Sequence, residues 1–264
     1  MKLRALATII ACLGSVSVAS ADEHADKLTE LAKQTQNPVA AMISVPIQEN
    51  INFGSGPEKN VGNIINIQPV IPVPLTNEWN MINRIVLPVI YNPKPEERFG
   101  LSDANISLFF SPVSKTGFIW GAGPVIQMPT ATDKLLGSGK WAAGPTAVMV
   151  YMDGPWVFGA LANNRWSFAG EGGRREYNQM LLQPFINYNL PGGWSLGTAP
   201  LMNADWKARS KDQWTVPVGG TVSKVFKLGP QMMSAAAGGY YNAVRPEYSP
   251  SWTLRFVLSF LFPE

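Results

Sequence analysis

Only one cysteine and one histidine occur among the 264 residues, and neither is placed to serve a catalytic site. Cys12 falls in a segment that we expect to be removed on export, so the mature chain has no disulfide and no thiol chemistry. His24 follows near the start of the mature chain, whereas the base of a Ser/His/Asp triad has to be held by a rigid scaffold. No Cys/His cluster indicates a transition-metal site. The sequence therefore predicts a protein that is not an enzyme and holds no cofactor.

Charge and long apolar runs are also scarce. Charged residues make up 15% of the chain, and the formal net charge of +3 falls to +1 once Lys2 and Arg4 of the export signal are removed. Such a balance predicts no nucleic-acid partner. The apolar stretch at residues 5–18 is shorter than the ~20 residues that a membrane-spanning helix needs.

The first residues have the organisation of a cleavable export signal. A basic start at residues 1–4 precedes the apolar stretch, and Ala19-Ser20-Ala21 forms a small-x-small cleavage site. We therefore expect residues 1–21 to be removed and the mature chain to begin at Asp22. The alternative, an N-terminal membrane anchor, is disfavoured by the length of the apolar stretch.

What the mature chain does contain is a hydrophobic alternation with a period of two. In residues 179–190, Met180, Leu182, Ile186, Tyr188 and Leu190 share one face, and polar side chains including Gln183 and Asn187 share the other. Such segments recur about twelve times, near 41–53, 63–73, 80–91, 101–111, 118–129, 141–151, 156–167, 177–190, 194–206, 214–227, 231–243 and 252–262. A closed barrel pairs every backbone group across lipid, so we predict an all-β fold, a transmembrane antiparallel up-and-down β-barrel of about twelve strands over residues 39–264.

The connections and the tryptophans support this topology. Tight turns rich in Gly, Pro, Asn and Asp alternate with longer, more charged links, as expected for short periplasmic turns and longer outer loops. The nine tryptophans mostly fall near predicted strand ends, where an amphipathic ring suits a membrane interface. Residues 22–38 have helical spacing that ends at Pro38, and this short N-terminal helical leader is expected to plug the lumen, to lie in the periplasm, or to have no function.

Proline argues against the prediction. Eight prolines fall inside the predicted strands, although proline cannot donate to a strand ladder and belongs at edges or bulges. They are Pro46, Pro69, Pro88, Pro124, Pro145, Pro184, Pro200 and Pro217. Either these strands contain bulges, or some of them are shorter than predicted.

The parity of the strands predicts which polar side chains face the lumen. On the last strand Leu254, Phe256 and Leu258 share the apolar face, which places Arg255 on the other. The lumen-lining candidates are Arg84, Asp103, Asn105, Gln183, Asn187, Asn203, Asp205 and Arg255. Because a lumen arginine is most often paired with a carboxylate, we expect Arg84 and Arg255 to pair with Asp103 or Asp205. This pairing would be structural, with a selectivity role as the alternative.

One loop motif invites a chemical interpretation. Gly137-Ser138-Gly139-Lys140 has part of a phosphate-binding pattern, but Lys134 replaces the leading glycine and Trp141 stands where Ser or Thr is needed. We therefore interpret it as a flexible outer loop.

Several longer stretches resemble a known family. They include residues 28–39, 66–72, 86–91, 137–141, 183–191 and 214–217, which read LTELAKQTQNPV, NIQPVIP, VLPVIY, GSGKW, QPFINYNLP and WTVP. They are similar to a Gram-negative family catalogued as "neuromedin U", which itself resembles outer-membrane transporters labelled "MetA-pathway of phenol degradation". The resemblance covers essentially the whole mature chain and implies transport of apolar or aromatic solutes, without any catalytic residue. One departure from common barrel patterns is that Pro263-Glu264 follows the final phenylalanine.

Two functions remain open at this stage, and both place the protein in the bacterial outer membrane. The first is a barrel that passes or binds small, apolar or aromatic molecules; the second is a structural or surface-interaction barrel with a plugged lumen. Both imply outer-membrane lipid and the barrel-assembly machinery as partners. A secreted soluble β-sandwich is a third possibility, disfavoured by the low charge. The substrate, the openness of the lumen and the oligomeric state are not determined by the sequence.

Overall fold

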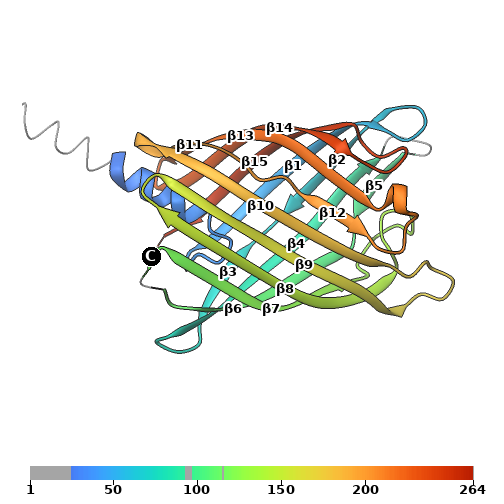
Figure 1. Cartoon of the computed structure of the whole chain (residues 1–264), viewed down its shortest axis with the longest axis horizontal. Helices are drawn as coiled ribbons and strands as arrows, with labels where there is room; N and C mark the ends of the chain where they lie inside the picture. The colour runs from blue at the N-terminus through green and yellow to red at the C-terminus, as the bar shows by residue number, and fades with distance from the viewer. Residues whose placement is uncertain (1–24, 93–96, 115, 264) are drawn as a thin grey trace, which may run out of the picture.

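The computed structural model describes residues 25–92, 97–114 and 116–263, and the predicted export signal, Cys12 and His24 lie outside them. The chain forms a closed antiparallel β-barrel of twelve strands with one short helix at one end (Figure 1). The predicted fold class is confirmed. The barrel closes where β1 (Ile43–Ser55) pairs with β15 (Trp252–Phe262), in continuous register from Ile43↔Phe262 to Phe53↔Trp252.

Fifteen strand segments make the twelve barrel strands, because three strands are interrupted. Their bounds are β2 (Asn60–Ile67) continued by β3 (Val70–Pro74), β4 (Trp79–Asn92), β5 (Arg98–Leu101) continued by β6 (Ala104–Pro112), β7 (Phe118–Met128), β8 (Lys140–Asp153), β9 (Trp156–Gly170), β10 (Asn178–Leu190), β11 (Trp194–Thr198) continued by β12 (Met202–Asp205), β13 (Trp214–Leu228) and β14 (Gln231–Val244). Two short 3-10 turns, η1 (Pro191–Gly193) and η2 (Ser210–Asp212), lie in connections. Each strand pairs with its neighbours in sequence, as the up-and-down prediction requires.

The interruptions accompany several of the prolines, whereas Pro124 and Pro145 face each other in the continuous register of β7 and β8. Pro69 lies between β2 and β3, and Pro200 lies between β11 and β12. Pro184 and Pro217 face the second interruption from the two neighbouring strands, and a register shift falls between Val216 and Pro217. The ladder is already open at these points, so a residue without an N–H loses no strand hydrogen bond. At these four prolines the strands therefore contain the irregularities that the sequence predicted.

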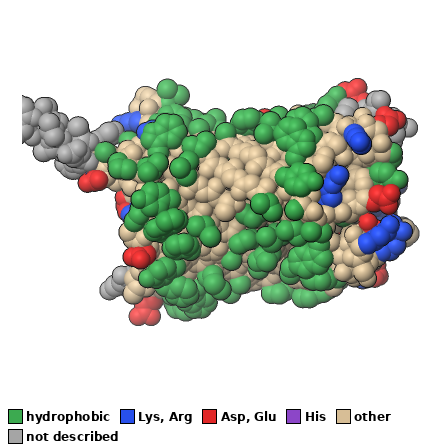
Figure 2. Space-filling model, turned by 45° about the horizontal axis from the view of Figure 1, so that its top comes forward, with side chains coloured by type: hydrophobic (Ala, Val, Ile, Leu, Met, Phe, Trp, Pro, Cys, Tyr) green, Lys and Arg blue, Asp and Glu red, His purple; other side chains and the backbone are tan. Residues whose placement is uncertain are grey.

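The outer wall carries an apolar belt between charged ends. Figure 2 shows hydrophobic side chains over the visible wall and Lys, Arg, Asp and Glu side chains gathered at the two ends. Trp141 and Tyr151 of β8 are both exposed and ten positions apart, which at about 3.3 Å per residue and a tilt of about 40° corresponds to a height of about 25 Å. This is the height expected of a lipid-facing band.

The tryptophans form two girdles, one at each end of this belt. Trp79, Trp120, Trp156 and Trp194 lie toward the short turns, and Trp141, Trp166, Trp206, Trp214 and Trp252 lie toward the longer loops. Neighbouring rings touch within the girdles: Trp79 meets Trp120 edge-on at 6.0 Å, and Trp206 meets Trp214 at 5.4 Å. Among the described residues, no helix is long and apolar enough to cross a membrane.

The N-terminal segment closes one end of the barrel, which we call the helix end; the opposite end, with the longer connections, is the loop end (Figure 1). The helix at residues 25–35 buries Leu31 and Ala32 against Val225 and Leu261 of the inner wall. Beyond it, Val39 joins an apolar cluster from the other side of the lumen, with Val70, Ile82, Phe109, Val148, Val150, Val157, Leu161 and Phe185. Residues 36–42 therefore cross the interior, which matches the plug interpretation of the leader.

Candidate lumen site

The barrel interior toward the loop end is hollow. The outer cavity, about 670 Å³, opens among the loops at that end. The inner cavity, about 260 Å³, lies against the N-terminal segment, and the middle cavity, about 190 Å³, lies between parts of the inner wall. The cavities are contiguous, because neighbouring cavities share lining residues. Asn66 and Asn105 line both the outer and the middle cavity, and Gln48 and Gln183 line both the middle and the inner cavity.

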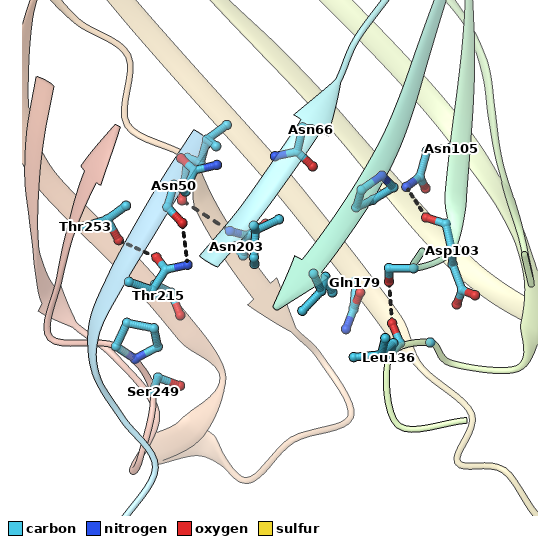
Figure 3. A pocket seen from close by; sticks show the side chains of 18 of the residues that line it. Asn50, Asn66, Asp103, Asn105, Leu136, Gln179, Asn203, Thr215, Ser249 and Thr253 are labelled. Carbon is cyan, nitrogen blue, oxygen red and sulfur yellow. Dashed lines mark hydrogen bonds between the residues drawn. The ribbon is translucent and has the colours of Figure 1, made fainter. Parts of the chain in front are cut away.

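The outer cavity is lined mainly by amides and hydroxyls from many strands, together with the carboxylate of Asp103 (Figure 3). Asn50 of β1, Asn66 of β2, Asn105 of β6 and Asn203 of β12 all point into it. These side chains occupy the inward positions of their strands, because alternate residues of a strand face opposite sides of the wall. The site is therefore a consequence of strand parity, repeated around the barrel.

Arg255 is held at the boundary between the outer and inner cavities, both of which it lines. Its Nε donates to Asn50 Oδ1 at 3.1 Å, and its Nη1 donates to the backbone oxygen of Ala199 at 2.9 Å. Its guanidinium carbon lies 4.5 Å from the ring centroid of Tyr240, a cation–π distance. The Tyr240 hydroxyl in turn accepts a bond from the Ala199 N–H at 3.2 Å. Ala199 belongs to the interruption between β11 and β12, so the broken ladder supplies the backbone groups that hold Arg255.

Two more arginines occupy equivalent boundaries. Arg84 lines the inner and middle cavities, and its Nη2 donates to Gln68 Oε1 at 2.7 Å. Arg165 lines the outer and middle cavities, and its Nη1 donates to Asn105 Oδ1 at 2.6 Å and to Gln127 Oε1 at 2.8 Å. Each arginine therefore stands between two of the three cavities. Together they form the arginine ring, defined as Arg84, Arg165 and Arg255.

Asp103 has a different partner from the one predicted. It lies in the interruption between β5 and β6, and its Oδ2 accepts bonds from the Ser138 N–H and Ser138 Oγ, both at 2.6 Å, and from Gln127 Nε2 at 3.1 Å. Its Oδ1 accepts a longer bond from the Ala131 N–H at 3.4 Å. Asp103 thereby fastens the 129–139 loop over the mouth of the outer cavity, by contacts that the interpretation as a flexible outer loop did not include.

The same loop is fastened from other sides. Arg174 donates to the backbone oxygens of Lys134, Gly137 and Ser138, and Arg98 pairs with Asp133 at 2.8 Å. Lys134 pairs with Glu171 at 3.0 Å and holds the pKa of that carboxyl below its usual range. The pKa of Asp133 is also lowered, mainly by the backbone N–H of Leu135 and then by Arg98.

The eight predicted lumen residues all line cavities. Asn203 and Arg255 line the outer cavity with Asp103 and Asn105; Arg84, Gln183 and Asn187 line the inner cavity. Asp205 is at the loop end, where it lines a further cavity of about 480 Å³ that shares Gln179, Asn203 and Thr215 with the outer cavity, and it pairs with Arg175 at 3.3 Å. Among the described residues, no group of three or more His, Cys, Asp or Glu is placed to hold a metal ion.

The predicted pairing of Arg84 and Arg255 with Asp103 or Asp205 is wrong. Both guanidiniums donate to neutral acceptors. Asp103 instead accepts hydrogen bonds from Ser138, and Asp205 forms an ion pair with Arg175. Parity places a side chain on a face but gives no information on its height in the barrel or on which strand lies across the lumen. Arg165 was missed altogether, although it shares the inward parity of Val157 and Leu161 on β9, which would have identified it.

Comparison with known proteins supports the fold. The COG4313 outer membrane channel from Pseudomonas putida F1 is similar, with a TM-score of 0.65 and 16% identity, covering 84% of this chain and 94% of that chain. The NanC porin has a TM-score of 0.55 and 9% identity, and the match covers 83% of this chain and 100% of the porin. Outer membrane phospholipase A from Escherichia coli matches with a TM-score of 0.47 and 9% identity, over 90% of this chain and 97% of the phospholipase. This likeness is too weak to bear on function. No family model and no curated protein matches the sequence.

Proposed function

We propose that this chain is an outer-membrane channel that passes small molecules and whose helix end is closed by its own N-terminal segment. The observation that carries the proposal is the series of contiguous cavities that runs from the loop end to residues 36–42. A barrel kept only as a structural element has no need of such a path, because side chains alone can fill the interior of a small barrel. Two barrels of similar fold, a channel and a porin by name, are consistent with this role.

The outer-membrane location rests on the wall of the barrel. The apolar belt, the two tryptophan girdles and the charged ends suit a bilayer with the helix end in the periplasm and the loop end outside. The export signal at residues 1–21 supplies the route, and outer-membrane lipid and the barrel-assembly machinery are the partners this location requires. The mature chain is then a leader over residues 22–38 followed by the barrel over 39–264.

The solutes we propose are small molecules with an apolar or aromatic part. The resemblance noted in the sequence favours that class, and the inner cavity offers a matching surface from Pro38, Met42, Val70, Leu161 and Phe185. We do not propose catalysis, because the polar groups of the lumen hold arginines and a loop rather than a nucleophile beside a base.

The N-terminal segment is the element to test, because it separates the cavities from the helix end. A Cβ at Gly121 of β7 would lie 3.4 Å from Cγ1 of Val39, close to the Sγ-to-Cβ spacing across a disulfide. The variant Val39→Cys/Gly121→Cys should therefore tether the segment to the wall under oxidising conditions. Cys12, the only native cysteine, lies in the segment expected to be removed.

The experiment compares single-channel conductance in planar bilayers. We expect the lowest conductance from the oxidised double variant, wild-type behaviour after reduction, and the highest conductance from a chain that lacks residues 22–38. The single variant Val39→Cys is the control for the substitution itself. If none of these proteins conducts, and none admits a small aromatic solute into vesicles, the channel proposal fails.

A structural barrel with a plugged lumen is the second candidate. It is favoured by the depth of the plug, since Ala32 and Val39 are almost fully buried and Gln36 bonds to Asn189 and Ser195 at 2.8 and 3.0 Å. This candidate predicts that tethering the segment changes neither conductance nor solute entry.

A further inference from the structure

The charge of the lumen is not balanced. The inner and middle cavities are lined by Arg84, Arg165 and Arg255, and no carboxylate of the described residues lines either of them. Asp103 is the one acidic residue lining the outer cavity in the described part of the chain, and its carboxylate is taken up by Ser138 and Gln127. Cations in a confined space that lack an opposite charge are costly unless water or an anion compensates them.

The arginines also keep unused hydrogen-bond donors. A guanidinium carries five N–H groups, yet Arg84 donates through Nη2 alone, to Gln68, within the described residues. The Nε of Arg165 is buried without a partner in the described structure. Their present partners are neutral amide oxygens, and a carboxylate would be a stronger acceptor because charge-assisted bonds are about twice as strong.

The inner cavity combines this charge with an apolar surface. Arg84 and Arg255 line it beside Tyr240, and Met42, Leu161 and Phe185 contribute hydrophobic side chains. We propose, on the basis of the channel function above, that the inner cavity binds a small organic anion: a carboxylate held by Arg84 and Arg255, with an apolar body against the hydrophobic side chains. The arginine ring thereby selects anionic over neutral and cationic solutes on the path from the outer cavity.

The ligand chemistry is tested by calorimetry on the wild-type protein in detergent. Benzoate is the probe, benzamide is its neutral analogue, and acetate carries the charge without the aromatic ring. We expect saturable benzoate binding, and we expect benzamide and acetate each to bind at least about tenfold more weakly. Benzamide loses the charge-assisted bond, and acetate loses most of the apolar burial. Equal binding of benzamide would overturn the role of the arginines, and equal binding of acetate would overturn the role of the apolar side chains.

The roles of the two arginines are tested by the variants Arg84→Gln and Arg255→Gln. We expect each variant to bind benzoate at least about tenfold more weakly than the wild type does. Lys211→Gln is the matched control, because Lys211 is an exposed cation at the loop end paired with Glu247, and we expect unchanged binding. Heat-shifted mobility on a detergent gel checks that each variant is folded, and Arg255→Lys tests the charge where Arg255→Gln fails to fold. If the folded Gln variants bind as the wild type does, the assignment is wrong.

The anion site and the channel function can fail separately in these experiments. A protein that conducts but binds no benzoate refutes the anion site and leaves the channel standing. A protein that binds benzoate through Arg84 and Arg255 but neither conducts nor admits a small aromatic solute into vesicles, with or without residues 22–38, supports the site and refutes the channel.

Discussion

Replacement of Asp103 by alanine should release the 129–139 loop from the mouth of the outer cavity. Asp103 is 5% exposed, and its carboxylate accepts bonds at 2.6, 2.6 and 3.1 Å from Ser138 N, Ser138 Oγ and Gln127 Nε2. Alanine offers no acceptor, so the Ser138 N–H loses its partner, while Gln127 Nε2 keeps a bond to Ser138 Oγ at 3.2 Å and Ser138 Oγ keeps a longer one to the Lys140 backbone oxygen at 3.4 Å. The barrel strands on either side keep their own pairing, and we therefore expect the loss to be local.

The size of the effect follows from those bonds. A hydrogen bond to a charged group contributes about 1.5–3 kcal/mol, and three of them would give an upper limit well above the net effect. The freed Ser138 groups can be rehydrated because the loop borders the open outer cavity, so we expect the free energy of loop opening to fall by about 2–4 kcal/mol. That corresponds to an increase of about 30- to 1,000-fold in the exchange rate of the Ser138 N–H.

Hydrogen exchange on the folded barrel measures this directly. Glu171→Ala is the matched control, because it removes an exposed ion pair from the same loop, and we expect it to leave Ser138 exchange nearly unchanged. Exchange in Asp103→Ala as slow as in the wild type would refute the reasoning, because the loop would then be held by Arg174 and Arg98 alone. Equal acceleration in both variants would show that the loop is loosened by any lost contact.

Three further predictions concern the wall, the mouth and the export of the chain. Leu258→Arg should block assembly, since a cation facing the lipid costs roughly 2–4 kcal/mol near the midplane, whereas Ser259→Arg points into the inner cavity and should assemble; equal heat-shifted bands on a detergent gel would contradict this. Because Lys134 lowers the pKa of Glu171, their pairing stabilises the mouth above the ordinary glutamate pKa and is lost as the pH falls through the lowered one; an NMR titration should show that pKa rising towards its usual range in Lys134→Gln, and no change would refute the pairing. The mature protein should begin at Asp22 and fractionate with the outer membrane, and recovery from the soluble periplasmic fraction would exclude the barrel's proposed location.

The strand interruptions connect the fold to the lumen. At each of the three breaks, residues freed from the ladder contribute a group to the interior: Gln68 bonds Arg84, Asp103 bonds the 129–139 loop, and Ala199 bonds Arg255. Some of the prolines that argued against regular strands accompany these breaks, as Pro69 and Pro200 do. The irregular positions of the sequence therefore lie close to the residues that line the cavities.

The sequence by itself determined the wall of this protein. The period-two alternation, the tight turns and the nine tryptophans are local properties of the chain, so they predicted a twelve-stranded barrel and the inward face of residues such as Arg84 and Arg255. Only the tertiary structure decided which inward-facing side chains contact each other in the lumen. Arg165 contacts Asn105 across sixty positions, and Gln36 contacts Asn189 across 153, because barrel closure and strand stagger set which inward side chains share a height. No local pattern encodes that stagger, and for this reason the inward faces were predicted while their partners were not.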